Sequence, residues 1–150
     1  MAQSLSKIVV HVVFSTKNRE PSLPKTVHAD LYAYMVGILI SLDCITMAIN
    51  GTEDHVHALI LMSKTISVSK MMAKMKGGSS RWLNSRETTM KHFAWQAGYG
   101  AFSVSESKIP AVIEYIAGQE EHHKKTTFQD ELMTLLKRHK IPFDERYIWE

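Results

Sequence analysis

The chain has 150 residues, of which 45% are hydrophobic and 22% charged, with a formal net charge of +3 and a single cysteine. This length fits one compact domain, which we expect to span residues 1–150 with the C-terminal helix and tail included. No apolar run reaches the roughly 18 residues of a membrane span, one cysteine excludes an internal disulfide framework, and the first residues lack the pattern of a signal peptide. We therefore expect a cytoplasmic protein with no membrane partner.

Basic charge is concentrated in Lys64–Lys91, which holds seven Lys or Arg and one acid, Glu87. The remaining residues carry eleven basic and fourteen acidic side chains, so the positive charge belongs to one element. Such asymmetry favours a phosphate-rich partner. A solvated helix face is the alternative, and charge alone does not decide between them.

The first third of the chain predicts the order strand, helix, strand, strand. β-Branched residues alternate over Lys7–Ser15, and both faces of this strand are apolar, which indicates a sheet covered on both sides. After a proline-punctuated loop, a helix carries an apolar stripe that ends at Leu42. Cys44–Ile49 is a second strand, and the Asn50-Gly51 turn joins it as a hairpin to a strand that carries His55.

A helix with a methionine-rich face is predicted after Ser67, which is a candidate N-cap. Lys70, Lys74 and Arg81 follow another face of this helix, together with one of the glycines of Gly77-Gly78. Glycine inside a helix costs roughly 1 kcal/mol relative to alanine. Either a phosphate backbone approaches these glycines closely, or they mark a kink or a break between two shorter helices.

The second half predicts one hairpin and two helices. Phe93–Gln96 and Tyr99–Ser105 are expected to pair as short strands. Ser107 is expected to cap a helix that runs toward His123, and a last helix spans about Phe128 to His139. The buried face of the last helix is expected to carry three residues, Phe128, Leu132 and Leu135.

His55 and His57 are two residues apart on a strand, so both side chains leave the same face. They are either hydrogen-bonded histidines at a strand end or a pair of metal ligands, and the spacing also recurs in histidine-based phosphoryl chemistry. Tyr115 and Gln119 stand four residues apart on one helix. That helix is the simplest cover for the histidine face, which would bring an amide oxygen to the imidazoles as a third ligand and the phenol one turn away.

Several segments together resemble the single-tyrosine transposases of the HUH endonuclease superfamily, small enzymes of insertion sequences that move as single-stranded DNA. The segments that carry the resemblance are His11–Arg19, His55-Val-His57, Lys76–Leu83, Trp95–Ser103 and Tyr115–His123. The family more often has one glycine before its Ser-Ser-Arg run, where this chain has two.

The resemblance implies a ferredoxin-like or RRM-like α+β domain, with an antiparallel sheet of about five strands and helices on both faces. It implies a prokaryotic, DNA-associated homodimer that acts on single-stranded DNA folded into hairpins. Tyr115 is implied as the nucleophile that forms a 5′-phosphotyrosine and allows rejoining without ATP. His55, His57 and Gln119 are implied as ligands of one divalent ion, Mg²⁺ or Mn²⁺.

The chemistry is consistent with this assignment. A free tyrosine has a pKa near 10, so attack at neutral pH needs a base or a metal ion nearby. A mixed nitrogen and oxygen ligand set suits Mn²⁺ at least as well as Mg²⁺. DNA contacts are expected from six basic side chains: Lys17, Arg19, Lys70, Lys74, Lys76 and Arg81. His122 and His123 are expected to be a solvated pair near a helix C-terminus.

Three alternatives differ in function. A nucleotide hydrolase with a His-x-His-x-His strand would need its third histidine at Leu59, which argues against it. A non-catalytic ferredoxin-like module that binds single-stranded nucleic acid would have no reason to place Tyr115 and Gln119 opposite the histidines. A domesticated relative that cleaves genomic repeats would use the same residues as the transposase. Tyr115 as an ordinary core aromatic residue is the structural alternative.

Overall fold

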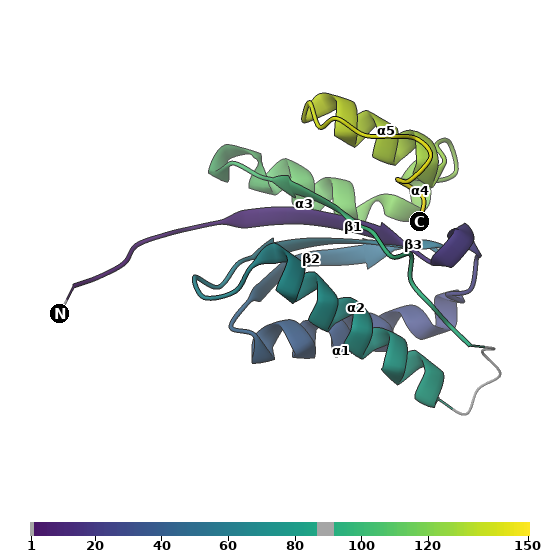
Figure 1. Ribbon diagram of the computed structural model, residues 1–150, viewed down its shortest axis with the longest axis horizontal. Helices are drawn as coiled ribbons and strands as arrows, with labels where there is room; N and C mark the ends of the chain where they lie inside the picture. The colour runs from purple at the N-terminus through teal and green to yellow at the C-terminus, as the bar shows by residue number, and fades with distance from the viewer. Residues whose placement is uncertain (1, 87–91) are drawn as a thin grey trace.

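The computed structural model describes residues 2–86 and 92–150, and within these ranges it has one four-stranded antiparallel sheet with helices on both faces (Figure 1). The strands are β1 (Val9–Ser15), β2 (Ile45–Gly51), β3 (His55–Leu61) and β4 (Gly100–Ser103), in the spatial order β2-β3-β1-β4. Helix α1 (His28–Ser41) joins β1 to β2, and helix α2 (Val68–Ser85) precedes β4. This βαββαβ order is the ferredoxin-like arrangement, so the expected fold class is confirmed.

Three further helices follow the sheet: α3 (Ile109–Ala117), α4 (Gln119–His122) and α5 (Phe128–Arg138). They cover the face opposite to α1 and α2 (Figure 1). Short 3₁₀ turns are formed by Lys17–Arg19, Lys25–Val27 and Glu106–Lys108. No helix in the described ranges is long and apolar enough to cross a membrane.

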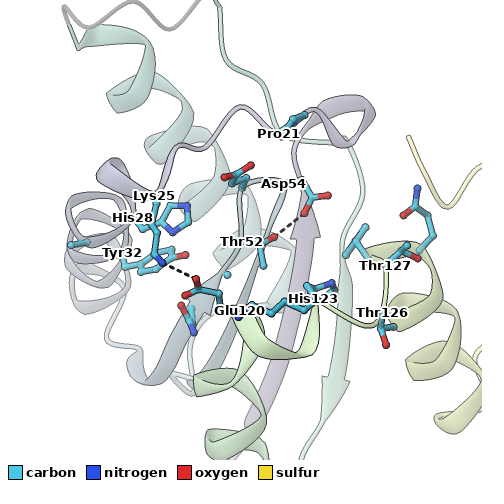
Figure 2. A pocket seen from close by; sticks show the side chains of 17 residues that line it. Pro21, Lys25, His28, Tyr32, Thr52, Asp54, Glu120, His123, Thr126 and Thr127 are labelled. Carbon is cyan, nitrogen blue, oxygen red and sulfur yellow. Dashed lines mark hydrogen bonds and ion pairs between the residues drawn. The ribbon is translucent and has the colours of Figure 1, made fainter.

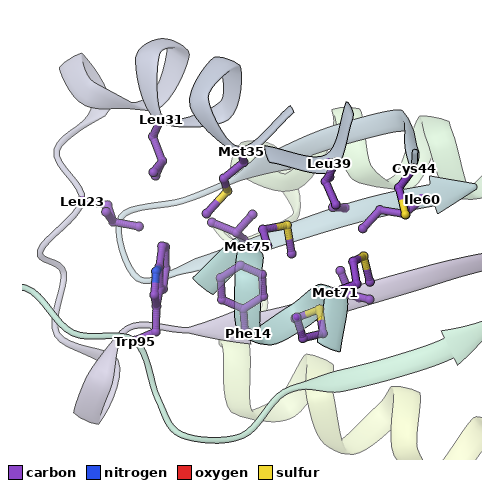
Figure 3. Close-up of a cluster of buried hydrophobic side chains, with 14 of the residues drawn as sticks. Phe14, Leu23, Leu31, Met35, Leu39, Cys44, Ile60, Met71, Met75 and Trp95 are labelled. Atoms are coloured by element: carbon purple, nitrogen blue, oxygen red, sulfur yellow. The ribbon is translucent and has the colours of Figure 1, made fainter. Parts of the chain in front are cut away.

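Strand β1 is buried along its whole length because it has a strand on each side and helices above and below. Its alternate residues Val10, Val12 and Phe14 join the larger core with α1 and α2, shown in Figure 3. Val9 packs with α3 and Val13 packs with α5 on the other face. The apolar character of both faces therefore correctly predicted a sheet covered on both sides.

The sheet has four strands rather than about five, because the segment Phe93–Gln96 does not form a strand with β4. It contributes one isolated bridge, between Thr16 and Trp95. The segment binds the end of β1 instead: the backbone N–H of Gln96 donates to the carbonyl of Ser15 at 2.9 Å, and the N–H of Ser15 donates to the side-chain oxygen of Gln96 at 2.7 Å. Strand β4 pairs with β1 instead.

The β2–β3 hairpin turns at Thr52–Asp54 rather than at Asn50-Gly51, since β2 continues through Gly51. A side chain at Gly51 would overlap the carbonyl oxygen of His55, so only glycine fits there. The backbone N–H of Thr16 donates to the carbonyl of Asp54 at 2.8 Å. The end of β1 and the lack of a side chain at Gly51 thus fix where His55 enters β3.

Helix α2 begins as predicted, with the Ser67 hydroxyl accepting a hydrogen bond from the N–H of Lys70 at 3.1 Å. It runs without interruption past Gly77 and Gly78, which excludes a break into two helices. A Cβ on Gly78 would lie 2.7 Å from Cδ1 of Ile38, so this glycine allows α1 and α2 to pack closely. A Cβ on Gly77 would meet only the Arg81 side chain, at 3.5 Å.

The helix expected from Ser107 to His123 is divided into two. A 3₁₀ turn precedes α3, whose N-cap is Lys108 rather than Ser107, and Gly118 separates α3 from α4. The last predicted helix is present as α5, with Phe128, Leu132 and Leu135 buried as expected.

Replacement of the two helical glycines tests the packing of α2 on α1. Gly77→Ala should raise the free energy of unfolding by roughly 0.5–1 kcal/mol, because alanine restricts the unfolded chain and its methyl group would make only an ordinary contact with the Arg81 side chain. Gly78→Ala should gain less, because Ile38 must move. Urea unfolding of both variants measures the difference. Equal gains would show that the two helices tolerate a methyl group at their contact.

Candidate active site

His55 and His57 lie on the face of β3 that α3 and α5 cover, and both side chains are fully buried. Nδ1 of His55 lies 2.6 Å from Oδ1 of Asp54. Because an ionised carboxylate only accepts hydrogen bonds, this Nδ1 carries the hydrogen and the Nε2 atom faces the site. Nδ1 of His57 lies 2.8 Å from Nε2 of His11, which turns the Nε2 of His57 toward the same place.

Burial sets the charge of these groups. It lowers the pKa of His57 to about 4, against the opposing effect of Glu131. Burial and the neighbouring His57 lower the pKa of His11 to about 3. For Asp54, burial alone would raise the pKa, but the hydrogen bond from His55 outweighs it and holds the pKa below its usual range. At pH 7 His11 and His57 are therefore neutral, the form in which imidazole binds metals, and Asp54 is ionised.

Helix α3 carries Tyr115, and residues before and after Tyr115 in this helix hold it on the sheet. Ile109 and Ile116 pack with Leu59 of β3. The side-chain amide of Asn50 donates to the carbonyl of Ile116 at 3.0 Å, which satisfies a carbonyl group at the end of the helix. The Tyr115 ring lies 5.8 Å from that of His57, measured between centroids.

Gln119 begins α4 and is fully buried. Its Oε1 lies 3.2 Å from Nε2 of His55, and its Nε2 lies 3.3 Å from a carboxylate oxygen of Glu131. A single chain thus brings together the four predicted site residues, His55, His57, Tyr115 and Gln119. Their individual roles remain predictions.

A fifth member, Glu131 of α5, was not predicted. Its side chain is 2% exposed, and its Oε1 lies 2.8 Å from Nε2 of His57 and 3.0 Å from Nε2 of His123. The same oxygen lies 3.5 Å from Nε2 of His55. The sequence carried a signal for this residue: Glu131 stands three positions after Phe128 and four before Leu135, so a charged group falls on the buried face of the predicted helix.

The other oxygen of Glu131 faces the tyrosine. Oε2 accepts a hydrogen bond from the Tyr115 hydroxyl and lies 3.2 Å from Nε2 of His122. Burial alone would raise the pKa of Glu131, but hydrogen bonds from His123, His57 and Tyr115 hold it well below its usual range. The carboxylate is therefore ionised. Burial, and the hydrogen bond to Glu131, raise the pKa of Tyr115 well above its usual value, so Tyr115 is held as a phenol.

The expectation of a solvated histidine pair fails for His123. Its side chain is 11% exposed and bonded to Glu131, whereas that of His122 is 33% exposed. Candidate ligand atoms of four residues lie within 4.8 Å of one another, as expected of a group that could hold a metal ion: His55, His57, His123 and Glu131. Oε1 of Gln119 adjoins this group through His55.

Two cavities give access to the site. One, of about 730 Å³, lies between α1 and α4 and is lined by Asp54 and His123, with the Lys25–Glu120 ion pair, 2.7 Å long, beside it (Figure 2). The other, of about 880 Å³, lies between α3 and α5. Its lining includes His11, Tyr115 and Glu131 together with the basic residues Lys108 and Arg138. A substrate can therefore reach the tyrosine hydroxyl from the α3–α5 side.

The predicted DNA contacts fall into two groups. Lys70, Lys74 and Arg81 are exposed on α2, which lies on the face of the sheet opposite to Tyr115 (Figure 1). Lys17 is also exposed. These side chains remain predicted DNA contacts.

The remaining two predicted contacts are used within the protein. Nζ of Lys76 donates to the carbonyls of Gln96 (2.8 Å), Ala97 (3.2 Å) and Gly98 (2.7 Å). Burial lowers the pKa of Lys76 to about 8. The guanidinium carbon of Arg19 lies 5.5 Å from the centre of the Trp149 ring, so Arg19 packs on the C-terminal segment.

This ferredoxin-like domain places the paired histidines opposite the tyrosine, the residues on which the HUH resemblance rests. The chain belongs to the IS200-like transposase family, whose model matches residues 4–119. Membership gives it the function of a transposase, a nuclease and strand-transfer enzyme. The match ends at Gln119, so α5 and Glu131 lie outside the matched residues.

Solved structures support the fold. A crystal structure described as a transposase from Deinococcus radiodurans R1 superimposes with a TM-score of 0.62 at 22% identity, covering 79% of this chain and 98% of that one. A REP-associated tyrosine transposase bound to a REP hairpin gives a TM-score of 0.62 at 13% identity, covering 82% of this chain and 74% of that one. A search of curated proteins gave no match.

Substitution of Lys76 tests whether its ammonium group is structural. Lys76→Met removes three hydrogen bonds from a charged donor and should lower the free energy of unfolding by about 2 kcal/mol. The matched control Lys74→Met, at an exposed position of the same helix, should change it by no more than about 0.5 kcal/mol. Thermal or urea unfolding gives both values. Equal stability of the two variants would contradict the structural role and leave Lys76 available for DNA.

Proposed function

We propose that the protein cleaves and rejoins single-stranded DNA through a covalent 5′-phosphotyrosine at Tyr115, assisted by one divalent ion that His55, His57 and Gln119 hold. The observation that carries this proposal is the convergence of the tyrosine hydroxyl and the Nε2 atoms of His55 and His57 on one carboxylate, Glu131, within a single chain. Because α5 completes this arrangement, we take residues 1–150 as one catalytic domain. The active form is proposed to be a homodimer.

The reaction exchanges one phosphodiester bond for another. Oη of Tyr115 attacks the scissile phosphorus, the Oη–P bond forms, and the P–O3′ bond breaks to release a 3′-hydroxyl end, whose oxygen takes a proton from water. As the Oη–P bond forms, the phenolic oxygen becomes strongly acidic, and its hydrogen then passes to Oε2 of Glu131, which already accepts its hydrogen bond. In rejoining, a 3′-hydroxyl attacks the phosphotyrosine, so no ATP is needed.

The donor set fits a divalent ion. With the ring hydrogen of His55 on Nδ1, toward Asp54, the lone pair of Nε2 faces the carbonyl oxygen of Gln119 at 3.2 Å, so two lone pairs point at one another. A cation bound between Nε2 of His55 and Oε1 of Gln119 would make this close approach favourable. When bound, the ion would supply charge to polarise the scissile phosphate. Nitrogen and oxygen donors together suit Mn²⁺ at least as well as Mg²⁺.

The DNA is proposed to contact two faces of the protein. Lys70, Lys74 and Arg81 are exposed on α2, which lies across the sheet from α3, the helix that carries Tyr115. They are suited to a hairpin stem, the type of ligand bound in the REP-associated structure. The scissile strand would enter the cavity between α3 and α5, where Lys108 and Arg138 offer positive charge.

Single-stranded DNA from the flanks of the protein's own gene tests the reaction. With Mn²⁺ or Mg²⁺, substrate labelled at its 3′ end should become covalently attached and migrate with the protein on a denaturing gel. Substrate labelled at its 5′ end should release a free labelled fragment instead. EDTA should abolish both products.

Tyr115→Phe should give no adduct, because it lacks the attacking oxygen. Tyr147→Phe, at an exposed position, is the matched control and should react as the parent does. Adduct formation by the Tyr115→Phe protein would refute the assignment of the nucleophile. DNA binding that persists in EDTA, with no adduct under either ion, would favour a non-catalytic binding module.

Charge removal tests the α2 face. Changing Lys70, Lys74 and Arg81 together to Gln should weaken DNA binding and reduce the slope of log affinity against log salt by about 0.9 for each phosphate of the hairpin stem that is no longer neutralised. A control that removes three exposed charges elsewhere, at Lys125, Lys137 and Lys140, should leave the slope unchanged. Fluorescence anisotropy over a salt series gives both slopes. If the two triple variants behave alike, the basic face of α2 is not a DNA site.

A further inference from the structure

Glu131 is a costly residue to bury. Helix α5 is attached to the sheet by Phe128, Leu132, Leu135 and Leu136, which pack around Val13 and Phe102. This apolar contact does not need a carboxylate. A buried charge gains little stability over an apolar residue of the same size, so its presence calls for a cationic partner or a chemical use.

The spacing of the atoms around Oε1 of Glu131 indicates what that partner is. Oε1 lies 2.8 Å from Nε2 of His57 and 3.5 Å from Nε2 of His55. Oε1 of Gln119 lies 3.2 Å from the same nitrogen of His55. Adjacent ligands of an octahedral ion whose bonds are about 2.1 Å long lie roughly 3 Å apart, and these three separations are close to that value.

The groups behind the ligands support the same arrangement. His55 is fixed by Asp54 and His57 by His11, each through its Nδ1. Nε2 of His123 lies 3.0 Å from Oε1 of Glu131 and orients the carboxylate. Partners of this kind are what a metal site needs to hold its ligands in place.

We infer that Glu131 is a fourth protein ligand of the divalent ion, through Oε1, beside His55, His57 and Gln119. This inference rests on the proposed function, which supplies the ion. Oε2 remains bonded to the Tyr115 hydroxyl, so one carboxylate links the ion to the nucleophile and sets the distance between them. Two positions of an octahedral ion are left for a phosphate oxygen and water.

Metal binding without DNA tests this inference separately from the reaction. Isothermal titration with MnCl₂, checked by the electron paramagnetic resonance of free Mn²⁺, should find one site in the full chain. Glu131→Gln, which keeps the shape and removes the charge, should weaken Mn²⁺ binding roughly 10- to 100-fold. Glu131→Asp should retain part of the affinity. Glu121→Gln removes an equal charge from the exposed face of α4 and should leave the affinity unchanged within about twofold.

The outcomes separate the two proposals. Unchanged Mn²⁺ affinity in a folded Glu131→Gln protein overturns the role of Glu131 while the parent site stands. Equal losses in Glu131→Gln and Glu121→Gln also overturn it, because general electrostatics would then account for both. A parent chain that binds no Mn²⁺ overturns the metal site as a whole, and the adduct experiment then decides whether the tyrosine chemistry survives. Circular dichroism melting of each variant establishes that it is folded, and Glu131→Asp carries the test if the glutamine variant is not.

Discussion

The antiparallel pairing of β1 with β3 is the constraint on which the site depends. In this register Val13 lies opposite His57 and Ser15 opposite His55. Because both strands are buried on both faces, a slip of one residue would turn the histidines toward α1 and α2 and carry Val56 to the other side. The apolar residues of the two faces therefore fix the register, and the register fixes the direction of the imidazoles.

The sequence predicted most of the fold because its patterns are local. Alternation in β1, the cap at Ser67 and the apolar stripe of α5 each depend on residues close together in the chain. The predicted pairing of Phe93–Gln96 with the following strand failed for a tertiary reason, since the backbone and the side chain of Gln96 both bind Ser15 at the end of β1. The break at Gly118 likewise accompanies a hydrogen bond to the carbonyl of Ile116 from Asn50, 66 residues earlier.

The site was predictable only in part. The pairs His55 with His57 and Tyr115 with Gln119 show in spacing, because each lies on one element. That the two pairs meet could be predicted only by assigning the helix of Tyr115 to the sheet face that carries the histidines, and from the family resemblance. Glu131 was missed because helical periodicity places it on the buried face but does not say what lies opposite. Only the packing of α5 on β1 and β4 brings it to His57.

Two carboxylates and two neutral imidazoles explain why this region is suited to a cation. Burial keeps His11 and His57 uncharged, while hydrogen bonds keep Asp54 and Glu131 ionised. The same burial that disfavours imidazolium strengthens the attraction of the carboxylates for a divalent ion, because little water screens them. The Glu131 carboxylate also accepts the hydrogen bond of the Tyr115 hydroxyl, so one residue would contact both the ion and the nucleophile. Before substrate arrives, this carboxylate keeps Tyr115 protonated and aligned. With an ion bound, it would also set the distance between the ion and the attacking oxygen.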